Sequence, residues 1–223
     1  MFLRIKNIFS NQLYFFVGYA LFLVFFGIVL YSFDKKTSSF WINQHWNIQL
    51  DSFFKYITHL GDGWSAFVVA VLLILFSPKL KYGIYAIGSF MITAILTQLC
   101  KRVFFSDSMR PAHEYFTEFS TGQWHRVDGV ELLTTNSFPS GHATSAFSMF
   151  CLLTLISKNK SFGIVFIVFA SLAAFSRVYL SLHFIEDIYV GSLIGCVGTI
   201  IVFIFLDSLK WRSAFEQSLF KRN

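Results

Sequence analysis

The sequence predicts an all-α membrane protein: one domain over residues 1–223, a polytopic bundle of six transmembrane helices with both termini in the cytoplasm. Hydrophobic residues make up 55% of the 223 residues and charged residues only 13%, about half the share of a soluble domain. Uncharged stretches also recur along the chain. This composition excludes a soluble enzyme. It also excludes a disordered chain, because disordered chains are poor in aromatic residues, which reach 20% here.

The expected spans follow from the uncharged stretches in order. Residues 13–33 contain no charge and match the roughly 20 residues that cross a bilayer as a helix. This stretch is too long for the apolar core of a signal peptide, so we expect it to remain attached. Pro78 ends the second span, because a proline ring cannot continue a helix. The remaining spans are expected at residues 64–76, 82–100, 143–157, 162–176 and 188–206.

The charged residues predict the orientation of these spans. Cytoplasmic loops are enriched in Lys and Arg. The two termini, the second loop and the fourth loop together hold ten basic and two acidic residues, whereas the other side holds eight basic and ten acidic residues. Both termini should therefore be cytoplasmic. The net charge of +6 then reflects membrane topology and attraction to anionic lipid, and no nucleic-acid partner is expected.

Polar residues end the long loop over residues 101–142, which faces outward in this topology. Ser140, Gly141 and His142 stand where the fourth span begins. The first N–H groups of a helix have no partner within the helix, so they can bind an anion, and glycine permits its close approach. The alternative is that Ser140 only caps the helix.

A second polar group precedes the sixth span. His183 and Asp187 are four residues apart, so on a helix they share one face. The carboxylate can then keep one imidazole nitrogen protonated and leave the other free to attack. In the alternative interpretation Arg177 and Asp187 form a buried ion pair and His183 is an interfacial residue. Ionisable groups at membrane depth are nevertheless functional candidates.

Together the two polar groups suit phosphoryl transfer. The cations Lys101, Arg102, Arg110 and Arg177 can hold phosphate oxygens, and guanidinium groups do so with two bonds at once. One histidine can attack phosphorus while the other protonates the departing oxygen. Histidine forms such a covalent intermediate without a metal, so no metal site and no cofactor are expected.

These residues resemble the motifs of the type 2 phosphatidic acid phosphatase superfamily, a family of integral-membrane lipid phosphatases. The second motif, Pro-Ser-Gly-His, matches residues 139–142, and the third matches Ser176-Arg177, His183 and Asp187 at the family's spacing. The first motif is Lys, six residues and Arg-Pro. Here Arg110-Pro111 follows Lys101 after eight residues or Arg102 after seven. Lys101 is preferred, because a loop can absorb two extra residues.

The resemblance implies a role for each matching residue. His183 would be the nucleophile, Asp187 its orienting partner and His142 the general acid. The implied phosphate-binding residues are Lys101, Arg110, Ser140, Gly141 and Arg177. The implied reaction is removal of phosphate from a membrane lipid through a phosphohistidine, at a periplasmic site in a bacterial inner membrane.

Several alternatives stay open at the level of sequence. Lipid A is the favoured substrate, beside phosphatidic acid, phosphatidylglycerol phosphate and undecaprenyl diphosphate. A lipid phosphotransferase and a non-catalytic lipid-binding protein fit part of the pattern. A zinc site of His142, His183 and Asp187 is disfavoured, because nearby arginines repel a dication. His59 and Asp62 are interpreted as ordinary polar capping at the start of the second span, and contact with the lipid head group is the alternative. The sequence does not predict the oligomeric state.

Overall fold

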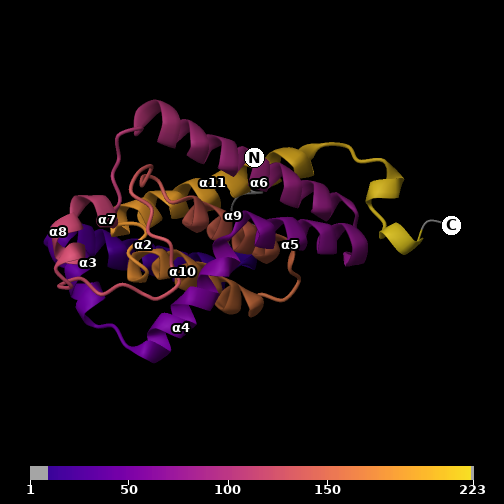
Figure 1. Cartoon of the computed structure of the whole chain (residues 1–223). Coiled ribbons are helices and arrows are strands. Elements are labelled where there is room, and N and C mark those ends of the chain that lie inside the picture. The colour runs from indigo at the N-terminus through magenta and orange to yellow at the C-terminus, as the bar shows by residue number, and fades with distance from the viewer. Residues whose placement is uncertain (1–9, 222–223) are drawn as a thin grey trace.

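The computed structural model describes residues 10–221, and within this range the fold is helical, with no strand beyond a single bridge between Met109 and Thr135 (Figure 1). A helix forms at each of the six stretches expected to span the membrane. The main helices are α2 (Leu13–Ser32), α3 (Lys35–Gln44), α4 (Ile48–Ile57), α5 (Gly63–Phe76), α6 (Lys81–Leu99), α9 (Gly141–Ile156), α10 (Phe162–Tyr179) and α11 (Ile185–Ser208). Short turns of helix are η1 (Thr58–Gly61), η2 (Cys100–Phe104), α7 (Pro111–Glu114), α8 (Phe116–Ser120), η3 (Ser213–Phe215) and η4 (Leu219–Lys221).

Four of these helices are long and apolar enough to cross a membrane: α2, α6 with its continuation η2, α10 and α11. A fifth span results if α4 and η1 are joined with α5 across a bend of 54°. The 16-residue α9 is shorter than the other candidates. The structure thus bears out a multi-pass helical bundle, while the count of six spans and the cytoplasmic termini stay predictions.

Helix α9 lies at the centre of the bundle and packs against α6, α10 and α11 (Figure 1). Two glycines of α11 allow it to approach α9 closely. A Cβ atom at Gly191 would lie 2.6 Å from the carbonyl oxygen of Ser140, and one at Gly195 would lie 2.4 Å from that of Thr144. This close packing brings the start of α11 against the start of α9, so residues of both helices reach one site.

Short polar side chains connect the three inner helices. Thr97 on α6 donates to Thr144 on α9 over 3.1 Å, and Ser148 on α9 lies 2.7 Å from Thr199 on α11. Hydrogen bonds between small side chains are a common means of joining membrane helices. They fix the register of α6, α9 and α11 toward the end of the bundle where the polar motifs lie.

The segment between α6 and α9 folds over that end and is tied to α3. The side-chain amide of Asn43 on α3 donates to the carbonyl of His125 and accepts from its N–H, over 2.9 and 2.8 Å. The indole of Trp124 donates to Ser181 over 2.9 Å. Lys35 forms ion pairs with Glu114 and Glu186. Side chains of α3 and of the turn before α11 therefore hold the long loop in place.

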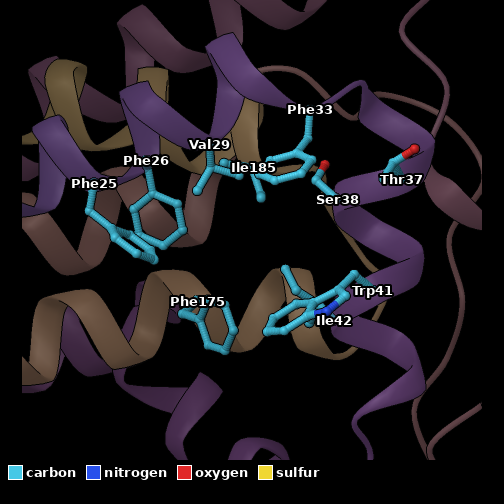
Figure 2. A pocket seen from close by; sticks show the side chains of 10 residues that line it. All are labelled: Phe25, Phe26, Val29, Phe33, Thr37, Ser38, Trp41, Ile42, Phe175 and Ile185. Carbon is cyan, nitrogen blue, oxygen red and sulfur yellow. The ribbon is translucent and has the colours of Figure 1, made fainter.

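An apolar cavity of about 600 Å³ lies between α2, α3 and α10 (Figure 2). Phe26 from α2, Ile42 from α3 and Phe175 from α10 line it. Phe175 and Arg177 are two residues apart on α10, so their side chains leave the helix on nearly opposite sides. The cavity and the side chain of Arg177 therefore lie on different sides of α10.

Candidate active site

The site is centred on His183, which lies in the turn between α10 and α11. Its Nδ1 is 3.0 Å from Oδ2 of Asp187, in the first turn of α11. The sequence prediction that one helix carries both residues is wrong, because α11 begins after His183. The same carboxylate oxygen accepts from the Ser137 hydroxyl over 2.5 Å and from the Phe184 N–H over 2.9 Å. This buried carboxylate oxygen thus has three hydrogen-bond donors, of which His183 is one.

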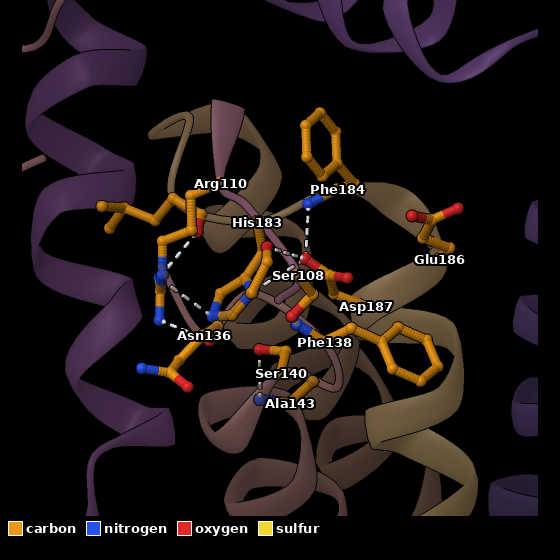
Figure 3. A network of polar contacts seen from close by, with 12 residues as sticks. Ser108, Arg110, Asn136, Phe138, Ser140, Ala143, His183, Phe184, Glu186 and Asp187 are labelled. Carbon is orange, nitrogen blue, oxygen red and sulfur yellow. Dashed lines mark hydrogen bonds and ion pairs between the residues drawn. The ribbon is translucent and has the colours of Figure 1, made fainter. Parts of the chain in front are cut away.

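Arg110 determines the hydrogen-bonding state of His183 (Figure 3). One terminal nitrogen of Arg110 is 3.3 Å from Nε2 of His183 and donates to the carbonyl of Leu182 over 2.7 Å. A guanidinium can only donate, so Nε2 must accept, and Nδ1 carries the hydrogen toward Asp187. Burial, followed by the charges of Arg110 and Arg177, holds the pKa of His183 well below its ordinary value. These surroundings favour the neutral imidazole with an unprotonated Nε2, the form that can attack phosphorus.

Two more cations lie at the same place. Arg177 on α10 is buried and donates to the Thr58 hydroxyl over 2.8 Å, and its Nε has no partner among the described residues. Lys101 is buried and donates to the carbonyls of Asn136 and Ser137 over 2.5 and 3.1 Å. Arg102 is exposed. Of the two candidates for the first motif, Lys101 is the one that lies with the cluster.

The start of α9 combines a capping serine with open space. Ser140 is the N-cap residue: its hydroxyl accepts from the Ala143 N–H over 3.3 Å, and its own N–H donates to the Asp187 carbonyl over 3.0 Å. A Cβ atom at Gly141 would meet no heavy atom within 4 Å. Ser140 therefore caps the helix, and the space beside Gly141 is open to a ligand.

His142 has a carboxylate partner that the sequence analysis missed. Its Nε2 is 2.6 Å from Oδ1 of Asp62, which is 80 positions earlier in the chain. The interpretation of Asp62 as a capping residue is wrong: it occupies the N-cap position of α5, but its side chain caps no N–H group. Thr58 and Ser137 were missed as well. Only Ser137 had a local signal, since it stands two residues before the second motif.

The site is rich in cations and lacks a cluster of metal ligands. In the part of the chain that the structure describes, no three His, Cys, Asp or Glu side chains are arranged to hold a metal ion. His183 and Asp187 face each other, whereas His142 faces Asp62. These three residues therefore do not form the zinc site that was considered as an alternative. Three buried cations, a helix N-terminus and a neutral histidine instead define a membrane protein with a site for phosphoryl chemistry.

Comparison with known proteins agrees with this class. Residues 82–211 match the PAP2 superfamily. The match includes more than half of the chain, and the protein belongs to this family, as the motifs predicted.

Similar relatives include proteins that are named as phosphatases. The chain is 26% identical over 157 residues to the lipid A 4'-phosphatase of Porphyromonas gingivalis, an alignment that covers 66% of this chain and 62% of that relative. The chain thus aligns with less than two thirds of that protein. It is 27% identical over 162 residues to the undecaprenyl-diphosphatase BcrC of Bacillus subtilis, with 72% of this chain and 76% of the relative covered.

Two solved structures share the fold. The crystal structure of Aquifex aeolicus LpxE has a TM-score of 0.63 and 26% identity, with 78% of this chain and 97% of that chain covered. The structure of a PAP2-type phosphatidylglycerolphosphate phosphatase from Bacillus subtilis has a TM-score of 0.58 and 21% identity, with 90% and 98% covered. The second similarity concerns the fold alone.

Proposed function

We propose that this protein is a membrane lipid phosphatase that works through a phosphohistidine on His183, with lipid A as the favoured substrate. The observation that carries the proposal is the environment of His183, which is buried, with Nδ1 held by Asp187 and Nε2 directed to a guanidinium. A structural histidine needs no such environment. The lipid A 4'-phosphatase relative supports the choice of substrate.

The first half-reaction transfers phosphate to the protein. The phosphate oxygens are held by Arg110, Arg177, Lys101 and the N–H groups at the start of α9. When the substrate binds, Arg110 gives up its contact with His183 and donates to a phosphate oxygen instead. Nε2 of His183 forms a bond to phosphorus while the bond from phosphorus to the lipid oxygen breaks. His142 gives its proton to that oxygen, which leaves as the lipid hydroxyl. Asp187 stabilises the positive charge that develops on His183.

The second half-reaction releases phosphate. His142, now neutral, takes a proton from a water molecule whose oxygen attacks phosphorus. The bond between phosphorus and Nε2 breaks, inorganic phosphate leaves, and His183 and His142 return to their starting states. The residues of the site are sufficient for both steps, so we expect no metal requirement.

The lipid part of the substrate fits an open groove of about 630 Å³ that begins at Asp62. Trp64 and Phe67 on α5 and Phe90 on α6 line the groove. An apolar groove next to the phosphate site suits a substrate with a charged head and long hydrocarbon chains.

The test of the function measures phosphate released by purified protein from lipid A, undecaprenyl diphosphate, phosphatidylglycerol phosphate and phosphatidic acid, in excess chelator. We expect activity without added metal, highest with lipid A, and inhibition by vanadate, which mimics five-coordinate phosphorus. Activity that is lost in chelator and restored by zinc would contradict the mechanism. A preference for undecaprenyl diphosphate would identify that lipid as the substrate, in place of lipid A. Transfer of phosphate only to an added lipid would identify a phosphotransferase.

We further propose that the protein lies in a bacterial inner membrane with this site facing the periplasm. The charge distribution along the sequence supports this orientation. A reporter fused after Asn223 should be cytoplasmic, and a cysteine that replaces Gln123 should react with an impermeant reagent added from outside. The opposite labelling pattern would contradict the proposed orientation but not the proposed reaction.

A further inference from the structure

A cluster of His59, Asp62 and His142 lies at the edge of the site. Asp62 uses both carboxylate oxygens: Oδ1 is 2.6 Å from Nε2 of His142, and Oδ2 is 2.7 Å from Nδ1 of His59. The His59 side chain is 66% exposed, whereas the Asp62 and His142 side chains are about one third exposed. The carboxylate thus connects an imidazole of the site with an imidazole in solvent.

The backbone around Asp62 is shaped for this contact. A Cβ atom at Gly61 would lie 2.8 Å from the carbonyl oxygen of His142 and 3.1 Å from its Cβ. Only glycine therefore lets η1 approach α9 this closely. Thr58, also on η1, accepts a hydrogen bond from Arg177. This short segment contacts two residues of the site, although it lies outside residues 82–211, which match the family.

The charges around His142 indicate a role for Asp62 in the protonation of this imidazole. A general acid must hold its proton until the leaving oxygen departs. Burial, together with the positive charges of Arg177 and Arg110, holds the pKa of His142 below its ordinary value, whereas the hydrogen bond and the negative charge of Asp62 oppose this shift. The charged and titratable groups that face His142 or its partner are Asp62, His59, Arg177, Arg110 and His183. Asp62 is the member of this set that favours the protonated imidazole.

We propose that Asp62 is the positioning residue of the general acid: it holds Nε2 of His142, favours the protonated imidazole and directs Nδ1 toward the leaving oxygen. His59 binds the second oxygen of Asp62 and fixes the carboxylate. This inference rests on the proposed function, in which His142 protonates the lipid oxygen. It assigns the second histidine of the site a partner on another element.

The test compares two leaving groups. Asp62→Asn should reduce turnover of a lipid phosphate about 10- to 100-fold, because an alkoxide departs only with a proton. With nitrophenyl phosphate, whose leaving group needs little protonation, the loss should be several times smaller. The basic limb of the kcat profile should move to lower pH, since His142 loses its proton more readily without the carboxylate. Asp62→Glu should recover part of the activity.

A matched control is Asp51→Asn. Asp51 lies 2.8 Å from Nε2 of His125 and accepts from Tyr179, away from His183 and His142. This variant should leave the leaving-group dependence and the pH profile unchanged. The double variant Asp62→Asn/His142→Ala should lose little beyond His142→Ala, because Asp62 acts through His142.

The outcomes separate this inference from the proposed function. If His142→Ala shows the leaving-group dependence and Asp62→Asn does not, Asp62 is not the positioning residue and the phosphatase mechanism stands. If His142→Ala lowers the turnover of both substrates equally, the proposed role of His142 as the acid is wrong. The proposed role of Asp62 is then wrong as well. Equal losses with both substrates for Asp62→Asn and Asp51→Asn would reduce Asp62 to a structural residue.

Discussion

The two histidine–aspartate pairs of the site differ in depth and in origin. His183 and Asp187 are four residues apart, with side chains at most 2% exposed. His142 and Asp62 come from different elements and are about one third exposed. The buried carboxylate oxygen also accepts from Ser137 and from a backbone N–H, whereas Asp62 divides its oxygens between two imidazoles.

The difference matches the two tasks of the proposed mechanism. A nucleophile must stay unprotonated, and burial among cations disfavours its protonated form. A general acid must be protonated and reach both the leaving oxygen and a water molecule, so partial exposure and a nearby carboxylate suit it. In the proposed mechanism, Asp62 favours the protonated form of His142, whereas the cations around His183 disfavour its protonated form.

The largest effect should come from removing the nucleophile. His183→Ala should abolish turnover of every substrate and the acid-quenched capture of labelled phosphate on the protein, because no atom remains to attack phosphorus. His142→Ala should retain capture and part of its turnover with nitrophenyl phosphate. His113→Ala, at an exposed position, is the matched control. Labelling of His183→Ala but not of His142→Ala would invert the two roles.

A smaller loss is expected for the carboxylate of the buried pair. Asp187→Asn keeps the shape of the side chain but loses the charge that stabilises the histidine when it becomes positive. Turnover should fall on the order of 10³-fold, with good and poor leaving groups alike, because the nucleophile takes part in both. Kinetics with the two leaving groups would check this. A loss confined to poor leaving groups would place Asp187 with the acid and remove the distinction between the pairs.

The pH dependence provides a third comparison. Because the pKa of His183 is lowered in the folded protein, its neutral form persists below about pH 6.5, the ordinary value. The acidic limb of kcat/KM assigned to His183 should therefore lie below that pH, after correction for ionisation of the substrate. Removing a cation with Lys101→Met should move this limb to higher pH. A limb that stays in place in this variant would show that it belongs to another group.

The same shift predicts a loss of stability in acid. Below about pH 6.5 the unfolded chain binds a proton at residue 183 that the folded chain does not bind. The free energy of unfolding should therefore decrease as the pH falls from about 6.5 toward the native pKa of His183. Denaturation followed across this range in detergent would measure the decrease. His183→Gln, which cannot titrate, should show a smaller decrease.

The smallest effect is expected at Ser137. Ser137→Ala removes one of three donors to the Asp187 carboxylate and leaves His183 and the Phe184 N–H in place. A single hydrogen bond of this kind is worth about 1 kcal/mol, so turnover should fall about three- to tenfold. Ser39→Ala is a control, because the buried Ser39 hydroxyl has no partner in the described part of the chain. A loss as large as that of Asp187→Asn would indicate that Ser137 contacts the substrate.

The sequence alone determined the class of the fold and half of the site. Uncharged stretches must form helices, because a membrane offers no partner for backbone polar groups, and a helix formed at each expected stretch. The pairing of His183 with Asp187 was also predicted, although the contact forms between the turn before α11 and its first turn and not along one helix. The helix ends were less accurate: α9, α10 and α11 extend past the apolar stretches into the polar motifs, because hydrogen bonding within a helix continues after hydrophobicity ends.

Only the tertiary structure decided which distant residues meet. Asp62 reaches His142, and Thr58 reaches Arg177, because η1 packs against α9 and α10. Lys101 joins the cluster and Arg102 does not, because the turn after α6 buries one side chain and exposes the next. Contacts between separate elements depend on how whole helices pack, and packing depends on the shapes of many side chains at once. No spacing in the sequence predicts them, so the contact between His183 and Asp187 could be predicted, whereas the contact between His142 and Asp62 could not.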